Sequence, residues 1–375
     1  MKVVLTGGGT GGHFYPLIAV AEALNNIIDE KNIAEAKIYY ISNEPYDEKI
    51  LHENRIIFKQ VSAGKLRLTP SLKSIGDLFS AAIGALQGFF TVFSIFPDVV
   101  FSKGGYAAFP TVLAAKILRI PVIIHESDSV PGRVNEWSGK FARAVAVSYK
   151  QDAQYFDKEK VVHTGQPIRH NLIEPTTEGA YEFLNLEDST PIIWVLGGSL
   201  GSETINYAVE KALPELLTNY QVVHQVGKSN FDTMKKLTDA TLIKHDFKYR
   251  YHIFDSLNTL SMKMMAGVAD IVITRAGSTL FEIAHWSIPS IVIPITESHR
   301  NHQIKNAYNY AREGACVVIE ENNLSEKLLT FEINRIIATP EVREEMKKGA
   351  EKFAIEGAAQ EIAEEIIGIG LNHEK

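Results

Sequence analysis

The sequence predicts an α/β fold made of two domains, each built around a parallel sheet. Its 375 residues are enough for about two domains of ordinary size. Short apolar runs with the character of buried strands alternate with stretches of helical spacing, which is typical of a parallel sheet covered by helices. This alternation lapses into turn and linker residues between 165 and 190 and then starts again.

Each half of the chain supplies its own series of expected elements. In the first half we expect strands at 2–6, 37–41, 56–61, 99–101, 121–125 and 144–148, and helices at 16–26, 75–95, 108–118 and 135–141. In the second half we expect strands at 192–196, 222–226, 250–254, 271–274, 290–293 and 316–319. We therefore place one domain at 1–165 and a second at 166–345, followed by a helix in 346–375 that packs back on the first.

The first expected strand runs directly into a glycine-rich turn, Gly7 to Gly12, and then into a helix. Such a turn lies at the carboxyl edge of a parallel sheet, where ligands bind. Glycine allows positive φ angles and a close approach to a ligand, and the start of the helix offers unpaired N–H groups. The pattern predicts a pocket for an anion or a polyol, with His13 as the titratable group that the turn presents.

The same turn also fits the dinucleotide pattern G-x-G-x-x-G through Gly7, Gly9 and Gly12. That fold places an acidic residue about 20 positions further on, at the end of the second strand. The nearest acid past the second expected strand is Glu44, which comes too late in the sequence. We therefore disfavour a nicotinamide or flavin dinucleotide.

The second half opens as the first does, with strand 192–196, the glycine turn 197–202 and a helix from about Glu203. Two domains that begin alike can face each other across a cleft, with both turns at the carboxyl edges of their sheets. Polar residues gather after four further strands, at 102–106, 125–128, 274–282 and 299–306. Their clustering predicts that the ligand site lies along these edges.

Composition and charge exclude several classes of protein. Residues 1–165 carry 18 Lys and Arg against 16 Asp and Glu, and the remainder carries 20 against 29. Because neither half has a strong basic excess, we expect no nucleic-acid partner. The single cysteine, Cys316, excludes a disulfide framework and a cysteine-rich metal site. The sequence opens on a strand rather than a secretory leader, so we expect the protein inside the cell.

Taken together, the polar stretches resemble the MurG family, glycosyltransferase family 28, in order and spacing. The motifs that carry the resemblance are Gly8-Gly9-Thr10-Gly11-Gly12-His13, Gly104-Gly105-Tyr106, His125-Glu126, Gly165-Gln166-Pro167-Ile168-Arg169, Gly197-Gly198-Ser199-Leu200-Gly201, Arg275-Ala276-Gly277-Ser278, His302-Gln303 and Asn306-Ala307. The resemblance spans essentially the whole chain. It implies a GT-B fold, in which two Rossmann-like domains face each other across a cleft, and an inverting transfer with no metal and no other cofactor.

The resemblance also implies the substrates. The donor is UDP-N-acetylglucosamine, held mainly by the C-terminal domain, and the acceptor is lipid I, the undecaprenyl-linked muramoyl pentapeptide, bound mainly by the N-terminal domain. Transfer to the acceptor's C4 hydroxyl gives lipid II for peptidoglycan synthesis, on the cytoplasmic side of the cell membrane. Three alternatives remain open: a sugar-nucleotide epimerase, a glycosyltransferase acting on diacylglycerol, and a non-catalytic sugar-nucleotide binder.

The resemblance further assigns roles to individual residues. Glu282 accepts hydrogen bonds from the ribose hydroxyls, Arg169 lies near the uracil, and Gln303 contacts the donor sugar. The other implied donor-binding residues are Thr10, Gly11, Gly12, Ser199, Gly201, Phe254, Gly277 and Ser278, and the implied acceptor-binding residues are Gly9, Gly104, Gly105 and Tyr106. Without a metal, the diphosphate charge must be met by backbone N–H groups, a helix N-terminus and hydroxyls.

An inverting transfer needs a base to take the proton from the attacking hydroxyl. Histidine is well suited because its ordinary pKa of about 6.5 lies near operating pH. We therefore expect His13 to be the base, with Asp128 and Glu126 as alternatives. Asp128 stands where the best-known members of the family have an asparagine that touches the donor. Because a carboxylate is repelled by a diphosphate, we expect Asp128 to face a hydroxyl or His13.

Residues 75–96 form the most apolar helical stretch of the chain. Asp77, Gln87 and three glycines argue against a span of the bilayer, which needs about 20 predominantly apolar residues. The stretch is either a core helix or a helix with one face on the membrane, with Lys65, Arg67 and Lys73 just upstream. The polyprenyl tail of the implied acceptor requires membrane contact, and this stretch is the best candidate for it.

Overall fold

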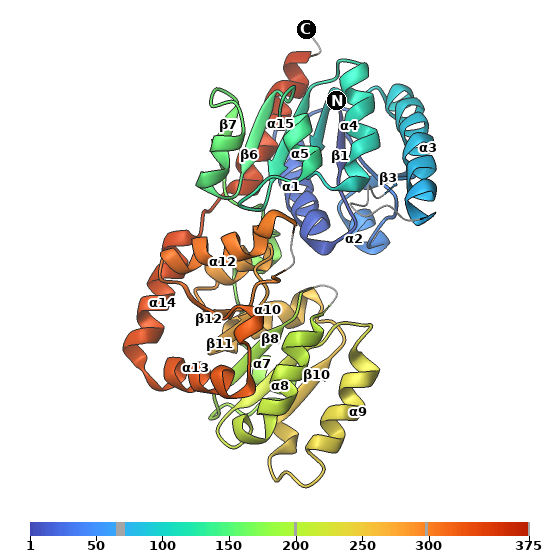
Figure 1. The fold of residues 1–375 in the computed structure, drawn as a ribbon. Helices are drawn as coiled ribbons and strands as arrows, with labels where there is room; N and C mark the ends of the chain where they lie inside the picture. Colours follow the sequence, from blue (N-terminus) through green and yellow to red (C-terminus); the bar gives the residue numbers. More distant parts are fainter. Residues whose placement is uncertain (65–71, 199–200, 297–298, 374–375) are drawn as a thin grey trace. The chain divides into compact units, whose positions relative to one another are not determined.

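The computed structural model describes residues 1–64, 72–198, 201–296 and 299–373 (Figure 1). The chain divides into two units. The first unit contains Met1–Arg169 and Ile355–Lys375, and the second contains His170–Ala354. Both boundaries lie later in the chain than the expected positions, 165 and 345.

The sheet of the first unit has, among the described residues, seven parallel strands in the order β3-β2-β1-β4-β5-β6-β7. They are β1 (Lys2–Thr6), β2 (Lys37–Ser42), β3 (Ile56–Gln60), β4 (Val99–Ser102), β5 (Val122–Glu126), β6 (Ala144–Val147) and β7 (Val161–His163). Val3 and Leu5 contribute to one hydrophobic core and Val4 to another, so the central strand is buried on both faces. The sequence did not predict β7, a three-residue edge strand in which Val162 and His163 are exposed.

Helices cover both faces of this sheet. The helices are α1 (Gly11–Glu30), α2 (Glu48–Glu53), α3 (Leu72–Ile95), α4 (Phe109–Ile117), α5 (Arg133–Ser138) and α15 (Ala358–His373), with short 3₁₀ helices η1 (Tyr106–Ala108) and η2 (Lys150–Tyr155). One core joins α1 and α15 to Val3 and Leu5, while the other joins α3 and α4 to Val4. Because the residues of the glycine turn are themselves helical from Gly11, α1 begins five residues before the expected start at 16.

The second unit repeats this architecture. Within the described residues its sheet has six parallel strands in the order β10-β9-β8-β11-β12-β13. They are β8 (Ile192–Leu196), β9 (Gln221–Gln225), β10 (Tyr251–Phe254), β11 (Ile271–Thr274), β12 (Ser290–Val292) and β13 (Cys316–Val318). All six strands expected in this half are confirmed to within one residue at each end.

The helices of the second unit are α6 (His170–Ile173), α7 (Ala180–Leu184), α8 (Glu203–Leu216), α9 (Phe231–Thr241), α10 (Thr259–Val268), α11 (Thr279–His285), α12 (His302–Arg312), α13 (Glu326–Ala338) and α14 (Pro340–Phe353), with 3₁₀ helices η3 (Lys248–Arg250), η4 (His299–Asn301) and η5 (Glu321–Asn323). Side chains of α8 and α13 pack together in one core with β8. A second core joins α11, α12 and α14 through Leu280, Tyr310 and Ala350.

The C-terminal segment explains where the second boundary falls. Met346 and Ala350 of α14 are buried in cores of the second unit, so residues 346–354 do not belong with the final helix. Ile362, Ile366 and Ile367 of α15 are buried in the core that contains α1. Only the last helix therefore packs back on the first unit.

Helix α3 has one packed face and one exposed apolar face. Val92 and Ile95 are buried, and a Cβ atom on Gly88 would lie 2.9 Å from the backbone of Pro110, so glycine allows α3 to approach α4 closely. The opposite face exposes Ile83, Leu86, Phe90 and Phe93, followed by Phe96, by 50 to 65%. Lys65 and Arg67 lie outside the described residues, as does the side chain of Lys73. In the part of the chain that the structure describes, no helix is sufficiently long and apolar to cross a bilayer.

Candidate active site

The glycine turn after β1 presents His13 at the start of α1. Gly9 has φ 88°, and a Cβ atom on it would lie 2.8 Å from the ring of Tyr106, so this position requires glycine. His13 lies in the first turn of α1, with its ring Nδ1 3.1 Å from the hydroxyl of Thr10. When Nδ1 donates to this hydroxyl, the lone pair of the ring is on Nε2, which is the form that a base requires.

The turn after β4 lies beside the same histidine. Gly104 and Gly105 have φ 75° and 76°, and a Cβ atom on Gly105 would lie 3.6 Å from Nε2 of His13. The predicted acceptor-binding residues of this turn, together with Gly9, are thus gathered around His13 in the first unit. A side chain at Gly105 would therefore lie against the ring of His13.

Beneath this turn lies a buried lysine. Lys103 is 2% exposed, and its Nζ lies 2.5 Å from His125 Nδ1, 2.5 Å from Ser127 Oγ and 3.5 Å from Gln166 Oε1. Burial lowers the pKa of Lys103 to about 7, against the opposing influence of the charges on Glu126 and Asp128. The cluster therefore holds a cation whose charge is supported by hydrogen bonds rather than by an ion pair.

The partners of the lysine are fixed in turn by further hydrogen bonds. His125 Nε2 lies 2.9 Å from the carbonyl oxygen of Gly165, and because a carbonyl only accepts, Nε2 carries the hydrogen and Nδ1 accepts from Lys103. Burial, with the nearby charge of Lys103, lowers the pKa of His125 well below its ordinary value, so the ring is neutral. Ser148 donates to Gln166 Oε1 at 2.9 Å. These contacts tie residues 165–166 to the first unit and explain why its boundary lies beyond 165.

Glu126, proposed as one alternative base, holds the loop that follows β5. Its Oε1 accepts from the backbone N–H groups of Ser127 and Asp128 at 2.8 and 3.1 Å, and its Oε2 accepts from Gly132 N and Asn135 Nδ2, both at 2.9 Å. Burial and the charge of Asp128 raise the pKa of Glu126 despite these hydrogen bonds. Since both oxygens are engaged by the loop itself, the geometry favours a structural role for Glu126 over that of base.

The other candidates of the first unit are Asp128, Arg169 and the donor-binding residues expected in the first turn. Asp128 is partly buried in the loop that Glu126 holds. The guanidinium of Arg169 stacks on the ring of Tyr15, 4.2 Å from its centroid. Arg169 thus belongs to the first unit and not to the expected domain at 166–345. Thr10, Gly11 and Gly12 lie in the first unit as well.

In the second unit, the glycine turn after β8 leads into α8. Gly201 has φ 78°, and a Cβ atom on it would lie 2.0 Å from the carbonyl oxygen of Val226, so only glycine fits. Ser202 caps α8 by accepting from Ile205 N at 3.3 Å. The dipole and the unpaired N–H groups at the N-terminus of a helix favour an anion. Ser199 lies outside the described residues.

Arg275 connects this turn to the neighbouring strands. Its guanidinium donates to Ser202 Oγ at 2.6 Å, to the carbonyl of Ile293 at 3.0 Å and to Glu321 Oε1 at 2.5 Å. Burial acts to raise the pKa of Glu321, but hydrogen bonds and the charge of Arg275 outweigh it and lower the pKa. Glu321 Oε2 accepts in turn from Thr296, so a single ion pair joins the segments that follow β8, β11, β12 and β13 at the sheet edge.

The remaining predicted donor residues of the second unit follow its parallel strands or lie close behind them. Phe254 ends β10, and Gly277 and Ser278 follow β11, where a Cβ atom on Gly277 would meet open space. Glu282 is partly buried in α11, four residues after Ser278. Gln303, in α12, accepts at its Oε1 from the backbone of Ile295 at 3.1 Å. These residues come from the same edge of the second sheet.

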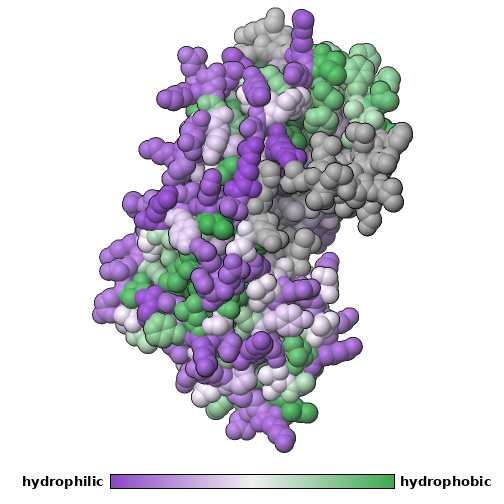
Figure 2. All heavy atoms as spheres, viewed as in Figure 1, coloured by the Kyte–Doolittle hydropathy of each residue, from purple (hydrophilic) through white to green (hydrophobic). Residues whose placement is uncertain are grey.

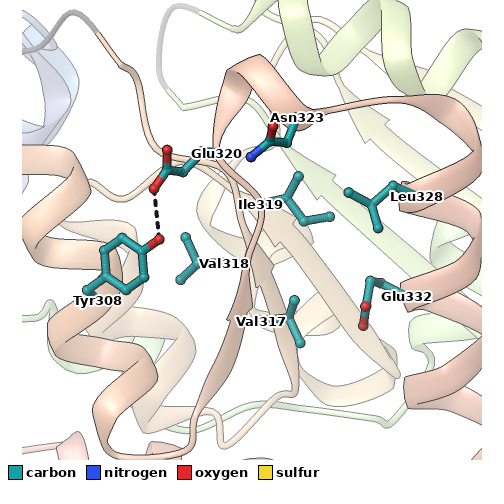
Figure 3. Close-up of a pocket in the computed structure, with 8 residues that line it drawn as sticks. All are labelled: Tyr308, Val317, Val318, Ile319, Glu320, Asn323, Leu328 and Glu332. Atoms are coloured by element: carbon teal, nitrogen blue, oxygen red, sulfur yellow. Dashed lines mark hydrogen bonds between the residues drawn. The ribbon is translucent and has the colours of Figure 1, made fainter.

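A cavity of about 220 Å³ lies elsewhere in this unit, beside β13 at the edge of the sheet (Figure 3). It is lined by Tyr308, Val317, Val318, Ile319, Glu320, Asn323, Leu328 and Glu332, with the hydroxyl of Tyr308 donating to Glu320 at 2.8 Å. None of the predicted site residues lines it. Among the described residues, no group of three or more His, Cys, Asp and Glu side chains is placed to hold a metal ion.

Two organising residues were not identified by the sequence analysis. Lys103 lies in the polar stretch 102–106 and Arg275 in the motif Arg275-Ala276-Gly277-Ser278, but neither received a role of its own. Both residues stand directly after a buried strand, where the long, positively charged side chain has to be either exposed or paired. This position in the sequence could have identified them.

Comparisons with known proteins identify relatives over most of the chain. Residues 3–147 match the glycosyltransferase family 28 N-terminal domain, and residues 192–362 match the glycosyltransferase family 28 C-terminal domain. A Bacillus cereus protein named UDP-N-acetylglucosamine--N-acetylmuramyl-(pentapeptide) pyrophosphoryl-undecaprenol N-acetylglucosamine transferase 2 is 33% identical over 366 residues, 97% of this chain and 99% of its own. A Thermodesulfovibrio yellowstonii transferase of the same name, without the number, is 34% identical over 373 residues, 97% of each chain.

The fold has solved counterparts as well. The crystal structure of MurG from Acinetobacter baumannii matches with a TM-score of 0.70 at 22% identity, covering 98% of this chain and 99% of that one. Two Rossmann-like units with all-parallel sheets and glycine turns at their carboxyl edges are the architecture of the GT-B fold, and both matching family models describe glycosyltransferases. Within that class, the chain belongs to glycosyltransferase family 28.

Proposed function

We propose that this enzyme transfers N-acetylglucosamine, with inversion, from UDP-N-acetylglucosamine to the C4 hydroxyl of lipid I, forming lipid II for peptidoglycan synthesis. The observation that carries the proposal is the match to relatives named for this transfer, which extends over 97% of the chain at 33 to 34% identity. Both glycine turns and the residues that hold them in place support it.

The proposed mechanism divides the work between the two units. In the first, His13 Nε2 takes the proton from the acceptor hydroxyl as that oxygen attacks the anomeric carbon, while Thr10 accepts from Nδ1 and fixes the ring. In the second, the N-terminus of α8 and the backbone near Gly277 meet the charge that develops on the departing diphosphate. Glu282 accepts from the ribose hydroxyls.

The transfer is tested by incubating the full chain with radiolabelled UDP-N-acetylglucosamine and a lipid I analogue. We expect label in the lipid product, which His13→Ala largely abolishes. The exposed histidine of α2 provides a matched control, because His52→Ala changes a histidine of the same unit outside the site. Label that moves to diacylglycerol, or a donor that is epimerised without transfer, would replace the proposal by one of its alternatives.

We further propose that the exposed face of α3 is where the enzyme meets the cytoplasmic membrane surface. Figure 2 shows hydrophobic side chains gathered on the first unit, over the region where Figure 1 draws α3. Leu86, Phe90 and Phe93 are 57 to 65% exposed there, and an apolar patch of this kind is typical of a membrane or protein contact.

Vesicle co-sedimentation tests the membrane face. The double variant Phe90→Ser with Phe93→Ser should bind vesicles that contain anionic lipid at least about 10²-fold more weakly, since each phenylalanine contributes about 1.5–3 kcal/mol when buried. Phe331→Ser, which changes a 60% exposed phenylalanine of α13, is the matched control and should bind as the unaltered protein does. Equal losses of vesicle binding in the double variant and in Phe331→Ser would exclude a specific role for α3.

A further inference from the structure

Lys103 is a buried titratable group that the proposed mechanism does not use. It stands directly after β4 and directly before the glycine pair beside His13. Three N–H donors of its ammonium face three acceptors, His125 Nδ1, Ser127 Oγ and Gln166 Oε1. This match of donors to acceptors fits the protonated form, because a neutral amine has only two hydrogens and one lone pair.

The three acceptors come from separate segments of the site. His125 lies in β5, Ser127 belongs to the loop that follows it, and Gln166 lies beyond β7. Two sets of hydrogen bonds hold this loop. Glu126 accepts from the backbone of residues 127 and 128, and Lys103 donates to the side chain of Ser127. Lys103 thus contacts the residue that precedes Asp128 in this loop.

We propose that Lys103 is a positioning residue whose protonated ammonium holds the loop of residues 126–128 against the acceptor-binding turn, and whose deprotonation weakens that hold. The proposal rests on the proposed function for its catalytic consequence. Lys103 is too deeply buried to touch substrate, so it acts through Ser127 and Asp128.

The surroundings of Lys103 make this contact sensitive to pH. The titratable groups that face it are His125 on β5 and Glu126 and Asp128 on the loop, and His13 lies on the far side of Gly105. Burial brings the pKa of Lys103 down to about 7, while the two carboxylates oppose that fall. Once the amine is neutral, the Ser127 hydroxyl can rotate and donate to Nζ instead of accepting from it. The hydrogen bond between Nζ and Ser127 then persists without the charge that strengthened it, so the loop is held less firmly.

The kinetic experiment compares four proteins: the unaltered chain, Lys103→Met, Ser127→Ala and the control Lys140→Met, which changes an exposed lysine of the same unit. The measurement is kcat/KM for a lipid I analogue between about pH 6 and pH 9. We expect a descending limb near pH 7 in the unaltered chain and in the control. Lys103→Met should lose this limb and be about tenfold slower near pH 6.5, with the KM for the donor unchanged.

Ser127→Ala keeps the experiment decisive if Lys103→Met does not fold. It removes one acceptor from the ammonium, so the descending limb should move to lower pH. A limb that keeps its position in Ser127→Ala, or that persists in a folded Lys103→Met protein, overturns the proposal and leaves Lys103 a purely structural residue.

A second readout is independent of turnover. In protein labelled with ¹³C-lysine, the Lys103 signal should titrate near pH 7, together with the backbone amide signals of Ser127 and Asp128. A Lys103 signal that titrates above about pH 9.5, close to the ordinary lysine value, would contradict the proposal, as would amide signals that do not follow it. If these signals titrate together but no sugar reaches the lipid, the proposed function fails while the role of Lys103 is supported.

Discussion

Both units place a buried cation beside a glycine turn, but the two cations have different partners. In the first unit Lys103 donates to a neutral histidine, a hydroxyl and an amide. In the second unit Arg275 donates to the carboxylate of Glu321 as well as to Ser202 and a backbone carbonyl. An arginine keeps its charge at every pH at which a protein is folded, whereas a buried lysine can lose its proton.

The difference separates the two tasks of the proposed reaction. The donor side has to bind a diphosphate that carries the same charge throughout the working pH range. The Arg275–Glu321 ion pair, which persists over that range, suits a site of fixed shape. The acceptor side has to move a proton, and its supporting lysine titrates in the same range as a histidine base. The comparison predicts that pH and mutation act differently on the two units.

The largest effect is expected at the base. His13→Ala should lower kcat by at least about 10²-fold, because a general base typically contributes 10²–10⁴. Donor affinity should change little, since the substitution removes the group that accepts the proton and no proposed contact with the donor. Asp128→Asn should be milder, and His52→Ala should retain full activity. A His13→Ala enzyme of near-normal kcat combined with a severe Asp128→Asn defect would move the base to Asp128.

The next effect concerns the stability of the donor side. Arg275→Met should lower the free energy of unfolding by about 3 kcal/mol, because it leaves the Glu321 carboxylate buried without its cation. Lys235→Met removes an exposed pair with Asp239 in the same unit and should cost less than about 1 kcal/mol. Urea denaturation distinguishes them. Equal losses of unfolding free energy in the two variants would show that the Arg275–Glu321 pair does not organise the edge of the second sheet.

The same ion pair has a pH dependence with a defined sign. The pKa of Glu321 is lowered in the folded protein, so its contribution is full above the ordinary glutamate value of about 4.3 and is lost as pH falls through the lower folded value. The difference in stability between the unaltered chain and Arg275→Met should therefore shrink only in acid.

A smaller effect is expected from the ribose contact. Glu282→Ala should weaken UDP binding by about 1–3 kcal/mol, because two ribose hydroxyls lose their acceptor. Calorimetry on the full chain measures it, with the exposed acid of α14 changed in Glu345→Ala as the control. Unaltered UDP affinity in Glu282→Ala would remove this residue from the donor site.

The last effect is a gradual change in the free energy of unfolding with pH, which we expect from Lys103. Its folded pKa lies below the unfolded value of about 10.4, so between about pH 7 and pH 10 the unfolded chain binds more protons and stability rises with pH. The slope is at most about 1.4 kcal/mol per pH unit, the value for one proton. Lys103→Met should lack this slope, whereas Arg275→Met should retain it. Parallel pH profiles for the unaltered chain and Lys103→Met would contradict the lowered pKa.

Local patterns were sufficient to predict the scaffold of both units. The continuous apolar runs located the described strands other than β7, because strand burial leaves marks on adjacent residues, whereas α1 begins five residues before its expected start. The partners of Lys103 could not be predicted, since His125 and Gln166 are 22 and 63 positions away and only the sheet order brings them together. Glu126 resembled a candidate base because sequence does not reveal that nearby N–H groups occupy both of its oxygens.

The most direct test of the central claim measures donor binding and acceptor turnover on one preparation across pH. Between about pH 6 and pH 8.5, the Kd for UDP-N-acetylglucosamine should stay within about twofold, because Arg275 keeps its charge, while kcat/KM for the acceptor should vary by about tenfold with titration of the His13 and Lys103 side. A Kd that follows the same pH curve as kcat/KM would contradict the division between a fixed donor side and a proton-linked acceptor side.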